Sequence, residues 1–303
     1  MPQTTIARTV IHTGVGLHSG RDVQMRLQPA PANSGIVFHV HTSSGVRRIA
    51  PCPSAVSATA LATTLSDGEA RVSTVEHVLA ALAGMAVDNV EIHVFGGEIP
   101  IMDGSAAPVL DLLKKAGMRT LPVPRRVARV RRALTVAGDG KAIRVWPHKG
   151  FYVDYTIDFS HTAIGRQRLC LEISPGTFAG IASARTFGFL QEVEYLHSRG
   201  LALGGSLNNA VVLDEQGVVN SDGLRCPDEF VRHKMLDFVG DMAMLGMPLQ
   251  GAFEVHCSGH QHNNAFLRRL SGARESYLEM VSEDPESDPV CEGRAFPAIA
   301  MPA

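Results

Sequence analysis

The sequence predicts an α+β protein made of two similar domains, each a small sheet packed on helices. The 303 residues are enough for two cores of ordinary domain size. A series of short strands and helices in the first half starts again after a proline-rich stretch at residues 120–124. The halves also share a spacing: His77 and His233 each precede a glycine by seven residues, in a helical pattern that leads into an apolar strand. Such an internal repeat lends weak support to a duplicated unit.

The first domain is predicted to span residues 1–121. A helix at residues 74–83 is entered through Ser73, and a second helix at 107–116 follows a turn-forming stretch. Residues 120–124 carry two prolines and neither a helical nor a strand period, so we place the linker there. Short runs rich in β-branched and apolar residues predict strands at 23–27, 35–40 and 89–95.

The second domain is predicted to span residues 126–278. A helix is expected at 187–198, ending at glycines, and a longer one at 227–245, where Pro227 suits the first turn. Beyond these, the chain is acidic and rich in proline and alanine, which predicts a loosely held tail at 279–303. The strands of this domain are expected at residues 127–136, 142–146 and 151–158.

Composition excludes several classes of protein. The net charge of −2 gives no basic field for nucleic acid. The longest apolar run, residues 78–87, is roughly half of what a bilayer-spanning helix needs, and the amino terminus lacks the layout of a secretory signal. We therefore expect a cytoplasmic protein with no stable membrane insertion. The five cysteines are scattered without a C-x-x-C pair, so a metal site would draw on nitrogen and oxygen ligands, for which 13 histidines are available.

The long helix at 227–245 carries a polar stripe of His233, Asp237 and Asp241, each one turn from the next. A His and an Asp four residues apart can present two ligands to one metal ion from a rigid scaffold. The competing interpretation is a solvated helix face with a weak His–Asp pairing, and this helix alone favours it.

A second candidate is the pair Glu76 and His77 at the start of the helix at 74–83. Ser73 and Glu76 have the spacing of a capping box, in which Glu76 would only satisfy a free backbone N–H group. His77 lies in the first turn, where the helix dipole disfavours protonation and leaves the neutral imidazole that a metal needs. Spacing does not decide between the two interpretations.

Two further stretches contain residues suited to catalysis. Ser258 and Gly259 form a turn that could aim His260 or His262 into a cleft, although two histidines in a polar loop are more often surface residues. In the other stretch, Thr186 could supply a hydroxyl, and Phe187 or Phe189 an apolar wall; alone, this stretch predicts no function.

Taken together, six motifs in order resemble the UDP-3-O-acyl-N-acetylglucosamine deacetylase family, the zinc enzymes of lipid A synthesis in Gram-negative bacteria. The resemblance covers nearly the whole chain. The motifs are Ser-Thr-Val-Glu-His-Val-Leu-Ala-Ala-Leu at 73–82, Ile-Pro-Ile-Met-Asp-Gly-Ser-Ala at 99–106, Ala-Arg-Thr-Phe-Gly-Phe at 184–189, Ser-Arg-Gly-Leu-Ala-Leu-Gly-Gly-Ser at 198–206, Phe-Val-Arg-His-Lys-Met-Leu-Asp at 230–237 and Ser-Gly-His at 258–260.

The resemblance implies a hydrolase that removes the N-acetyl group of a UDP-linked, acylated amino sugar and releases acetate. It places Zn²⁺ on His77, His233 and Asp237, with the fourth position open for water. It makes Glu76 the general base. The same donor set also fits Fe²⁺. The active site is then expected between the two domains of a monomer.

The remaining roles are also implied by the resemblance. His260 would be the protonated imidazole that stabilises the oxyanion and protonates the leaving amine, with Asp241 orienting it. Thr186 would donate to the tetrahedral intermediate, and Lys234 would meet the anionic or sugar part of the substrate. An insert near residues 187–213 would form the acyl-chain passage. The apolar contacts with substrate are expected from Phe159, Phe187, Leu190, Val193, Ala202 and Val212.

Two positions depart from or complicate this pattern. The family has a basic residue just before Ser-Gly-His, where this chain has Cys257, so one expected diphosphate contact stays open. His262 adds a second imidazole near His260, and the sequence leaves a swap of their roles open.

Two other functions remain to be separated from deacetylation. A non-haem iron(II) oxygenase also uses two histidines and a carboxylate, but it would need open coordination sites and a co-substrate pocket, and Glu76 would have no role. A catalytically silent sugar-nucleotide or lipid receptor would keep the cleft, but it would not need Glu76 or His260.

Overall fold

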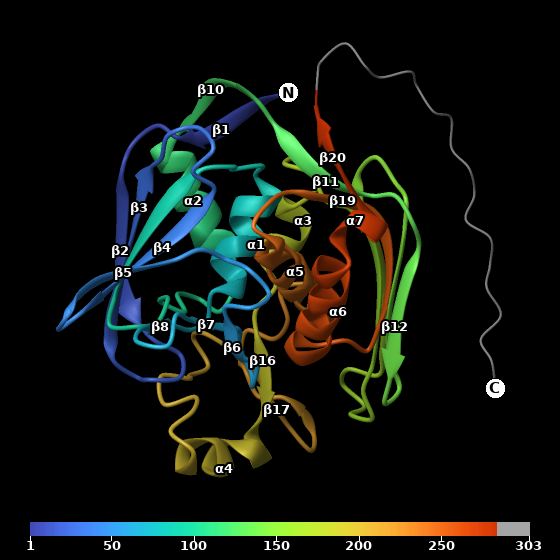
Figure 1. Ribbon diagram of the computed structural model, residues 1–303. Coiled ribbons are helices and arrows are strands. Elements are labelled where there is room, and N and C mark those ends of the chain that lie inside the picture. The colour runs from blue at the N-terminus through green and yellow to red at the C-terminus, as the bar shows by residue number, and fades with distance from the viewer. Residues whose placement is uncertain (284–303) are drawn as a thin grey trace.

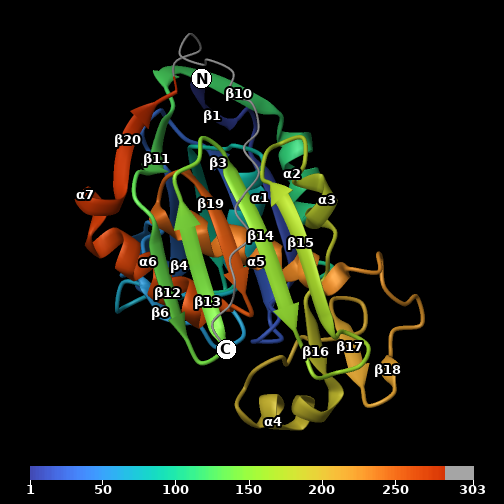
Figure 2. The same ribbon diagram turned by 90° about the vertical axis from the view of Figure 1, so that its right-hand side faces the viewer.

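The computed structural model describes residues 1–283, which form four layers: a sheet, two central layers of helices and a second sheet (Figure 1). The helices α1 (Glu76–Gly84) and α5 (Glu229–Met242) pack against each other at the centre. Figure 2 looks onto the outer face of the second sheet, with α5 behind it. The other helices are α2 (Ala107–Ala116), α3 (Ala179–Ala182), α4 (Val193–Ser198), α6 (His260–Gly272), α7 (Arg274–Tyr277) and the 3₁₀ turns η1 (Leu190–Glu192) and η2 (Ala243–Leu245).

Each half of the chain contributes a sheet with the same topology. In the first sheet, β9 is antiparallel to β3 and parallel to β4, and in the second sheet β19 relates in the same way to β13 and β14. The first sheet has the order β2 (Val10–Val15), β3 (Asp22–Pro29), β9 (Val90–Phe95), β4 (Ile36–Thr42) and β5 (Gly45–Ile49). The second follows β12 (Leu134–Gly138), β13 (Lys141–Trp146), β19 (Leu249–His256), β14 (Phe151–Asp158) and β15 (Arg166–Glu172).

This shared order confirms the predicted pair of similar α+β units. The helix before each central strand is also equivalent, because α1 precedes β9 and α5 precedes β19. Gly240, one of the two glycines of the sequence repeat, lets these helices approach closely: a Cβ atom there would lie 2.1 Å from the Glu76 carbonyl oxygen. The two histidines of the repeat are thereby brought to the same place between the sheets.

Smaller strands complete the fold. In the second half, β19 and β20 (Leu278–Ser282) flank β11 (Arg126–Val130). An inserted segment that includes α4 protrudes from one end of the molecule (Figure 1). Its strands are β16 (Phe187–Phe189), β17 (Val211–Asp214) and β18 (Gly217–Val218). The first half adds β1 (Pro2–Ile6), which pairs with β10 (Met118–Pro124), and a small sheet of β6 (Val56–Ala58), β7 (Thr64–Ser66) and β8 (Arg71–Val72).

Several predicted elements differ from the structure. The expected linker at 120–124 lies within β10, which tolerates its prolines because it pairs with β1 alone. The helix expected at 187–198 is helical only from Leu190 on, because β16 pairs with β17. Residues 279–282, the start of the expected tail, belong to β20 instead; residues 284–303 lie outside the described part of the chain.

The α1 helix begins at Glu76, two residues later than predicted, and Thr74 before it has a positive φ of 59°. The buried carboxylate of Glu98 holds this entry in place by accepting from the Thr74 hydroxyl and from the N–H groups of His18 and Ser19. Within residues 1–283, no helix has the length and apolar character needed to cross a membrane.

Candidate active site

The two central helices bring three metal-ligand side chains together. His77 comes from the first turn of α1, and His233 and Asp237 lie one turn apart on α5. Asp237 Oδ1 lies 3.6 Å from His77 Nε2 and 3.4 Å from His233 Nε2. All three side chains are buried. The stripe on α5 is therefore not the solvated face that the helix alone favours, because α5 is enclosed between α1, α6 and the second sheet.

The donor atoms fit a metal ion. In tetrahedral zinc sites with bonds of about 2.0–2.2 Å, neighbouring ligand atoms lie about 3.4 Å apart, close to the separations seen here. Asp237 Oδ1 is buried without a hydrogen-bond partner, and it is the atom that faces both imidazoles. A buried acceptor without a partner is costly, which a cation at this point would relieve.

His233 is held as a neutral ligand. Burial lowers its pKa to about 4 despite the neighbouring Asp237. Its Nδ1 lies 3.1 Å from the Ala184 carbonyl oxygen, so Nδ1–H donates and Nε2 keeps its lone pair for the metal. Burial opposes the charge of Asp237, but His233 and Lys234 hold the pKa of this carboxyl well below its usual range.

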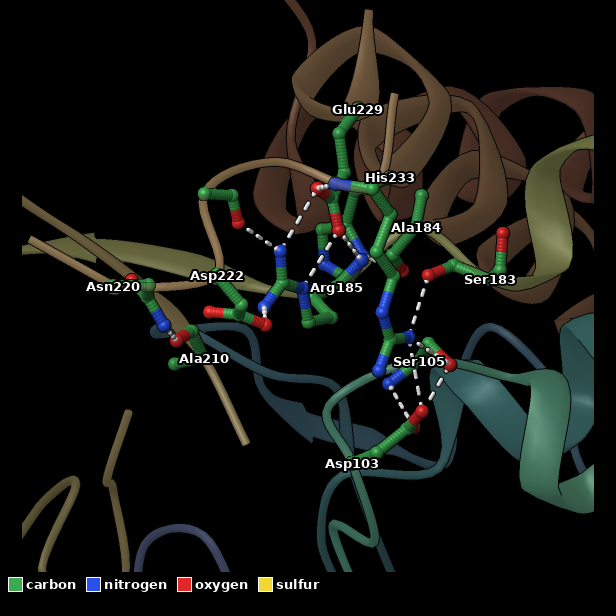
Figure 3. Close-up of polar contacts among 12 residues, drawn as sticks. Asp103, Ser105, Ser183, Ala184, Arg185, Ala210, Asn220, Asp222, Glu229 and His233 are labelled. Carbon is green, nitrogen blue, oxygen red and sulfur yellow. Dashed lines mark hydrogen bonds and ion pairs between the residues drawn. The ribbon is translucent and has the colours of Figure 1, made fainter. Parts of the chain in front are cut away.

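A buried ion pair positions the backbone that holds His233. Figure 3 shows Arg185 between Glu229 and Asp222, next to Ala184 and His233. Arg185 Nε donates to Glu229 Oε1 at 2.9 Å and Nη2 donates to Oε2 at 3.1 Å, and both side chains are almost fully buried. Glu229 also accepts from the Arg185 backbone N–H group. The pair thus anchors the segment before β16 to the start of α5.

Glu76 precedes His77 on α1 and is buried. Its Oε2 accepts from the Thr63 backbone N–H group at 3.0 Å, and no cap from Ser73 to the helix is formed, so the capping-box interpretation is wrong. Burial raises the pKa of Glu76, although the nearby His260 and His77 lower it. A raised pKa makes a carboxylate a better proton acceptor near neutral pH.

His260, at the start of α6, faces the same cluster. Its Nδ1 lies 2.8 Å from Asp241 Oδ2, and its Nε2 lies 3.9 Å from Asp237 Oδ2. Burial lowers the pKa of His260, but the carboxylates of Asp241, Asp237 and Glu76 together outweigh this and raise it to about 9, so the imidazole is protonated at pH 7. Asp241 also accepts from the Thr63 hydroxyl and from Asn263 Nδ2, both at 2.7 Å. His262 instead lies 3.3 Å from the Val136 carbonyl oxygen, so His260 alone of the two reaches Asp241.

An aromatic group borders the cluster. The Phe187 ring meets His233 edge-on at 6.2 Å and Phe159 at 5.7 Å between centroids. Thr186 is half-buried beside Phe187, and its backbone N–H donates to Gly104. Lys234 Nζ donates to Asp237 Oδ2 at 2.7 Å, which ties this cation to the carboxylate between the two imidazoles.

The residues expected to line the acyl-chain passage come from different parts of the insert. Leu190 and Val193 border a depression together with acidic side chains, and Leu190 is half exposed. Val212 pairs with Gly188 within the small sheet of the insert. Ala202 lies beside His18, to whose Nδ1 its N–H donates at 3.4 Å. A cavity of about 320 Å³ elsewhere between the two halves is bordered by none of the predicted site residues.

Cys257 has a positive φ of 49° and is half-buried, and burial raises the pKa of its thiol. Its Sγ lies 3.6 Å from His256 Nε2. A neutral thiol here offers no charge to a diphosphate, consistent with the departure noted in the sequence.

Sequence reasoning missed four supporting residues. Thr63 and Asn263 complete the partners of Asp241, and Arg185 and Glu229 form the buried pair behind His233. Asn263 follows His260 by three residues, so helical spacing could have indicated it. Thr63 carries no local signal, because its partner Asp241 is 178 positions away.

Comparisons with known proteins identify the family of this chain. A family model described as UDP-3-O-acyl N-acetylglycosamine deacetylase matches residues 3–272. A protein named UDP-3-O-acyl-N-acetylglucosamine deacetylase in Nitratidesulfovibrio vulgaris is 57% identical over 303 residues, which cover 100% of this chain and 96% of that protein. Proteins of the same name are 58% identical in Oleidesulfovibrio alaskensis, over 93% of this chain and 92% of the relative, and 41% identical in Pseudomonas entomophila, over 98% and 99%. The chain therefore belongs to the UDP-3-O-acyl N-acetylglycosamine deacetylase family.

Proposed function

We propose that this chain hydrolyses the N-acetyl group of UDP-3-O-acyl-N-acetylglucosamine, releasing acetate and a free amine at an early step of lipid A synthesis. One observation carries the proposal: the buried triangle of His77, His233 and Asp237 has a carboxylate base beside it and a protonated imidazole facing it. Hydrolysis of an unreactive amide needs a metal site, a general base and a general acid, and this chain belongs to a deacetylase family.

His77, His233 and Asp237 would hold the metal, for which we propose Zn²⁺; the donor set also suits Fe²⁺. A bound Zn²⁺ would polarise the acetamide carbonyl and lower the pKa of a bound water to about 7. The protein fixes the ligands beforehand: Ala184 sets the tautomer of His233, and Lys234 holds Asp237 ionised.

Proton transfer is assigned to two groups. Glu76 would take a proton from the attacking water, because its carboxylate is buried beside the ligands and its pKa is raised. His260 would give its proton to the departing nitrogen, and Asp241 keeps it charged until then. Thr186 would donate a hydrogen bond from its hydroxyl to the acetamide oxygen as negative charge develops there.

The substrate would extend from this cluster over the second half of the chain. We assign Lys234 to the anionic or sugar part and the edge-to-face rings of Phe159 and Phe187 to the nucleotide or acyl portion. We further propose that the protein is cytoplasmic and works as a monomer; the three donor side chains of the metal triangle all come from one chain. The acyl chain is assigned to the insert, with Leu190, Val193, Ala202 and Val212.

The ligand assignment is tested by His233→Ala. We expect this variant to lose one equivalent of bound metal together with acetate release, because one of the three donors is removed. Metal content by elemental analysis and acetate by a coupled assay are the measurements. His262→Ala, a histidine that faces the backbone of β12, serves as the matched control and should keep both. An unchanged metal content in His233→Ala would rule out the assignment.

The same assay separates the deacetylase from an iron(II) oxygenase. Acetate release under anaerobic conditions, without 2-oxoglutarate, is expected for a hydrolase because water is its only co-substrate. A requirement for oxygen would favour the oxygenase.

Asp241→Asn is expected to move the basic limb of the pH profile of kcat/KM to lower pH. Asp241 contributes most to raising the pKa of His260, which lies at about 9, and the protonated form is the one that works, so activity falls as pH rises through this pKa. Without the charge at residue 241, that pKa falls, and the limb should shift by about 1–3 pH units. Asp154→Asn, whose carboxylate pairs with Arg168 on the second sheet, should leave the limb in place. A limb that does not move in Asp241→Asn would show that His260 is not the titrating acid.

A further inference from the structure

A second group of metal-ligand side chains lies on the outer face of the first sheet. His39 on β4 pairs across the parallel strands with His93 on β9, and Glu91 precedes His93 by two residues. Residues two apart on a strand share a face, so all three side chains point to the same side. Val90, Ile92 and Val94 of β9 fill the core on the other face, toward α1 (Figure 1). This group therefore lies a full sheet away from the triangle of His77, His233 and Asp237 between the two halves (the cleft site).

The three side chains face a common gap, and they form no hydrogen bonds with one another across it. Glu91 Oε1 lies 3.7 Å from His39 Nε2, and Glu91 Oε2 lies 3.7 Å from His93 Nε2, both too long for hydrogen bonds. The two Nε2 atoms are buried without a hydrogen-bond partner, and their side chains are only 12% and 13% exposed. Native proteins leave few buried polar atoms unpaired, so this arrangement calls for a bound group that all three can contact.

We propose that His39, Glu91 and His93 bind a second divalent transition-metal ion, distinct from the one in the cleft. One donor atom from each lies within 4.8 Å of the others. Ligand atoms on a tetrahedral zinc ion are about 3.4 Å apart. The Glu91 oxygens, 3.7 Å from the two Nε2 atoms, would have to move closer by a few tenths of an ångström. A pair of donors at the 4.8 Å limit would have to close by about 1.4 Å, which side-chain rotation can supply. Two imidazoles and one carboxylate select Zn²⁺, Ni²⁺ or Cu²⁺ over Mg²⁺ and Ca²⁺, which prefer oxygen alone.

His41 acts as a positioning residue for this site. Its Nε2 lies 3.1 Å from His93 Nδ1, and its ring stacks on Phe95 with 4.0 Å between centroids. When His93 Nδ1–H donates to His41 Nε2, the Nε2 of His93 is left with its lone pair toward Glu91 and His39. Metal-binding histidines commonly donate the N–H group of their second ring nitrogen to an acceptor, and His41 Nε2 is the acceptor here.

Two arginines near this site lower its expected affinity for a metal ion. Arg26 pairs across the sheet with His93, and Arg48 pairs with His39. The Arg48 side chain points into solvent, which screens its charge, and the Arg26 guanidinium lies 5.8 Å from the Phe95 ring centroid. Their positive charges oppose a dication, so this site should bind metal more weakly than the cleft does.

Calorimetric titration of the metal-free, full-length chain with Zn²⁺ tests the proposal. The wild type should bind two equivalents, and Glu91→Gln and His77→Ala should each bind one, the former in the cleft and the latter on the sheet. The double variant should bind none. His41→Gln should raise the Kd of the weaker equivalent by about 10–100-fold. His12→Gln, a change on β2 of the same sheet, should retain two equivalents.

The outcomes separate the two sites. If the wild type binds one equivalent and His77→Ala none, water or a proton fills the gap and the sheet site is wrong; it is also wrong if Glu91→Gln still binds two. Circular dichroism checks that Glu91→Gln is folded, and His39→Gln, which should also bind one, is a second variant if it is not. Acetate release is no part of this readout, so a failure of the proposed deacetylation would leave the metal counts interpretable.

Discussion

Glu76→Gln is expected to lower kcat by about 10²–10⁴-fold, the usual contribution of a positioned general base. Glutamine keeps the shape of the side chain and can still accept the Thr63 N–H group, but it cannot take a proton from water. His77, the ligand next to it, is unchanged, so metal content should stay at the wild-type value. Acetate release under saturating substrate and elemental analysis of the same samples are the two measurements.

The control for this prediction is Glu69→Gln, which alters an exposed carboxylate in the turn between β7 and β8. It should leave kcat unchanged. Wild-type acetate release by Glu76→Gln would remove Glu76 from the mechanism. No acetate release by the wild type would favour the catalytically silent receptor, provided that it binds the sugar nucleotide.

The sequence predicted the fold well where local patterns repeat. The strand at 151–158 and the helix at 107–116 have the predicted bounds, because each is a single pattern ended by turn residues or glycine. The secondary structure of the insert was harder to predict. Residues 187–189 carry a helix-compatible pattern, yet they form β16 because a partner strand at residues 211–214 is available. Pairing between segments so far apart overrides local propensity and cannot be read from either segment alone.

The metal ligands show the same limit at the level of the site. His77 comes from the first half of the chain, and the pair of His233 and Asp237 comes from the second. Taken alone, each pattern could be explained without a metal, as a helix start or a solvated helix face. The 3.6 Å between His77 Nε2 and Asp237 Oδ1 follows from the packing of α1 on α5, which Gly240 permits. The resemblance to the deacetylase family grouped the three residues, which the spacing of residues along the sequence could not do. The structure adds Thr63, which links Asp241 to the loop before β7 and which no sequence pattern indicates.

Outside the cleft, the largest effect is expected from Arg185→Met, which should lower the free energy of unfolding by about 3–5 kcal/mol. Methionine fills similar space but leaves the Glu229 carboxylate, which is 0% exposed, without its cation. Urea denaturation followed by circular dichroism gives the difference in unfolding free energy. The matched control is Arg168→Met, which breaks the pair with Asp154 where the arginine is 65% exposed, and it should cost no more than about 1 kcal/mol.

Loss of Arg185 should also weaken the metal site that it supports from behind. Its backbone and guanidinium both donate to Glu229, and the residue before it, Ala184, supplies the carbonyl that fixes the tautomer of His233. A freed Ala184 carbonyl lets His233 rotate, and loss of such an outer partner typically costs 10–100-fold in metal affinity. If Arg185→Met lost as little unfolding free energy as Arg168→Met, the pair would be solvated in solution, and the rigid ligand geometry would need another source.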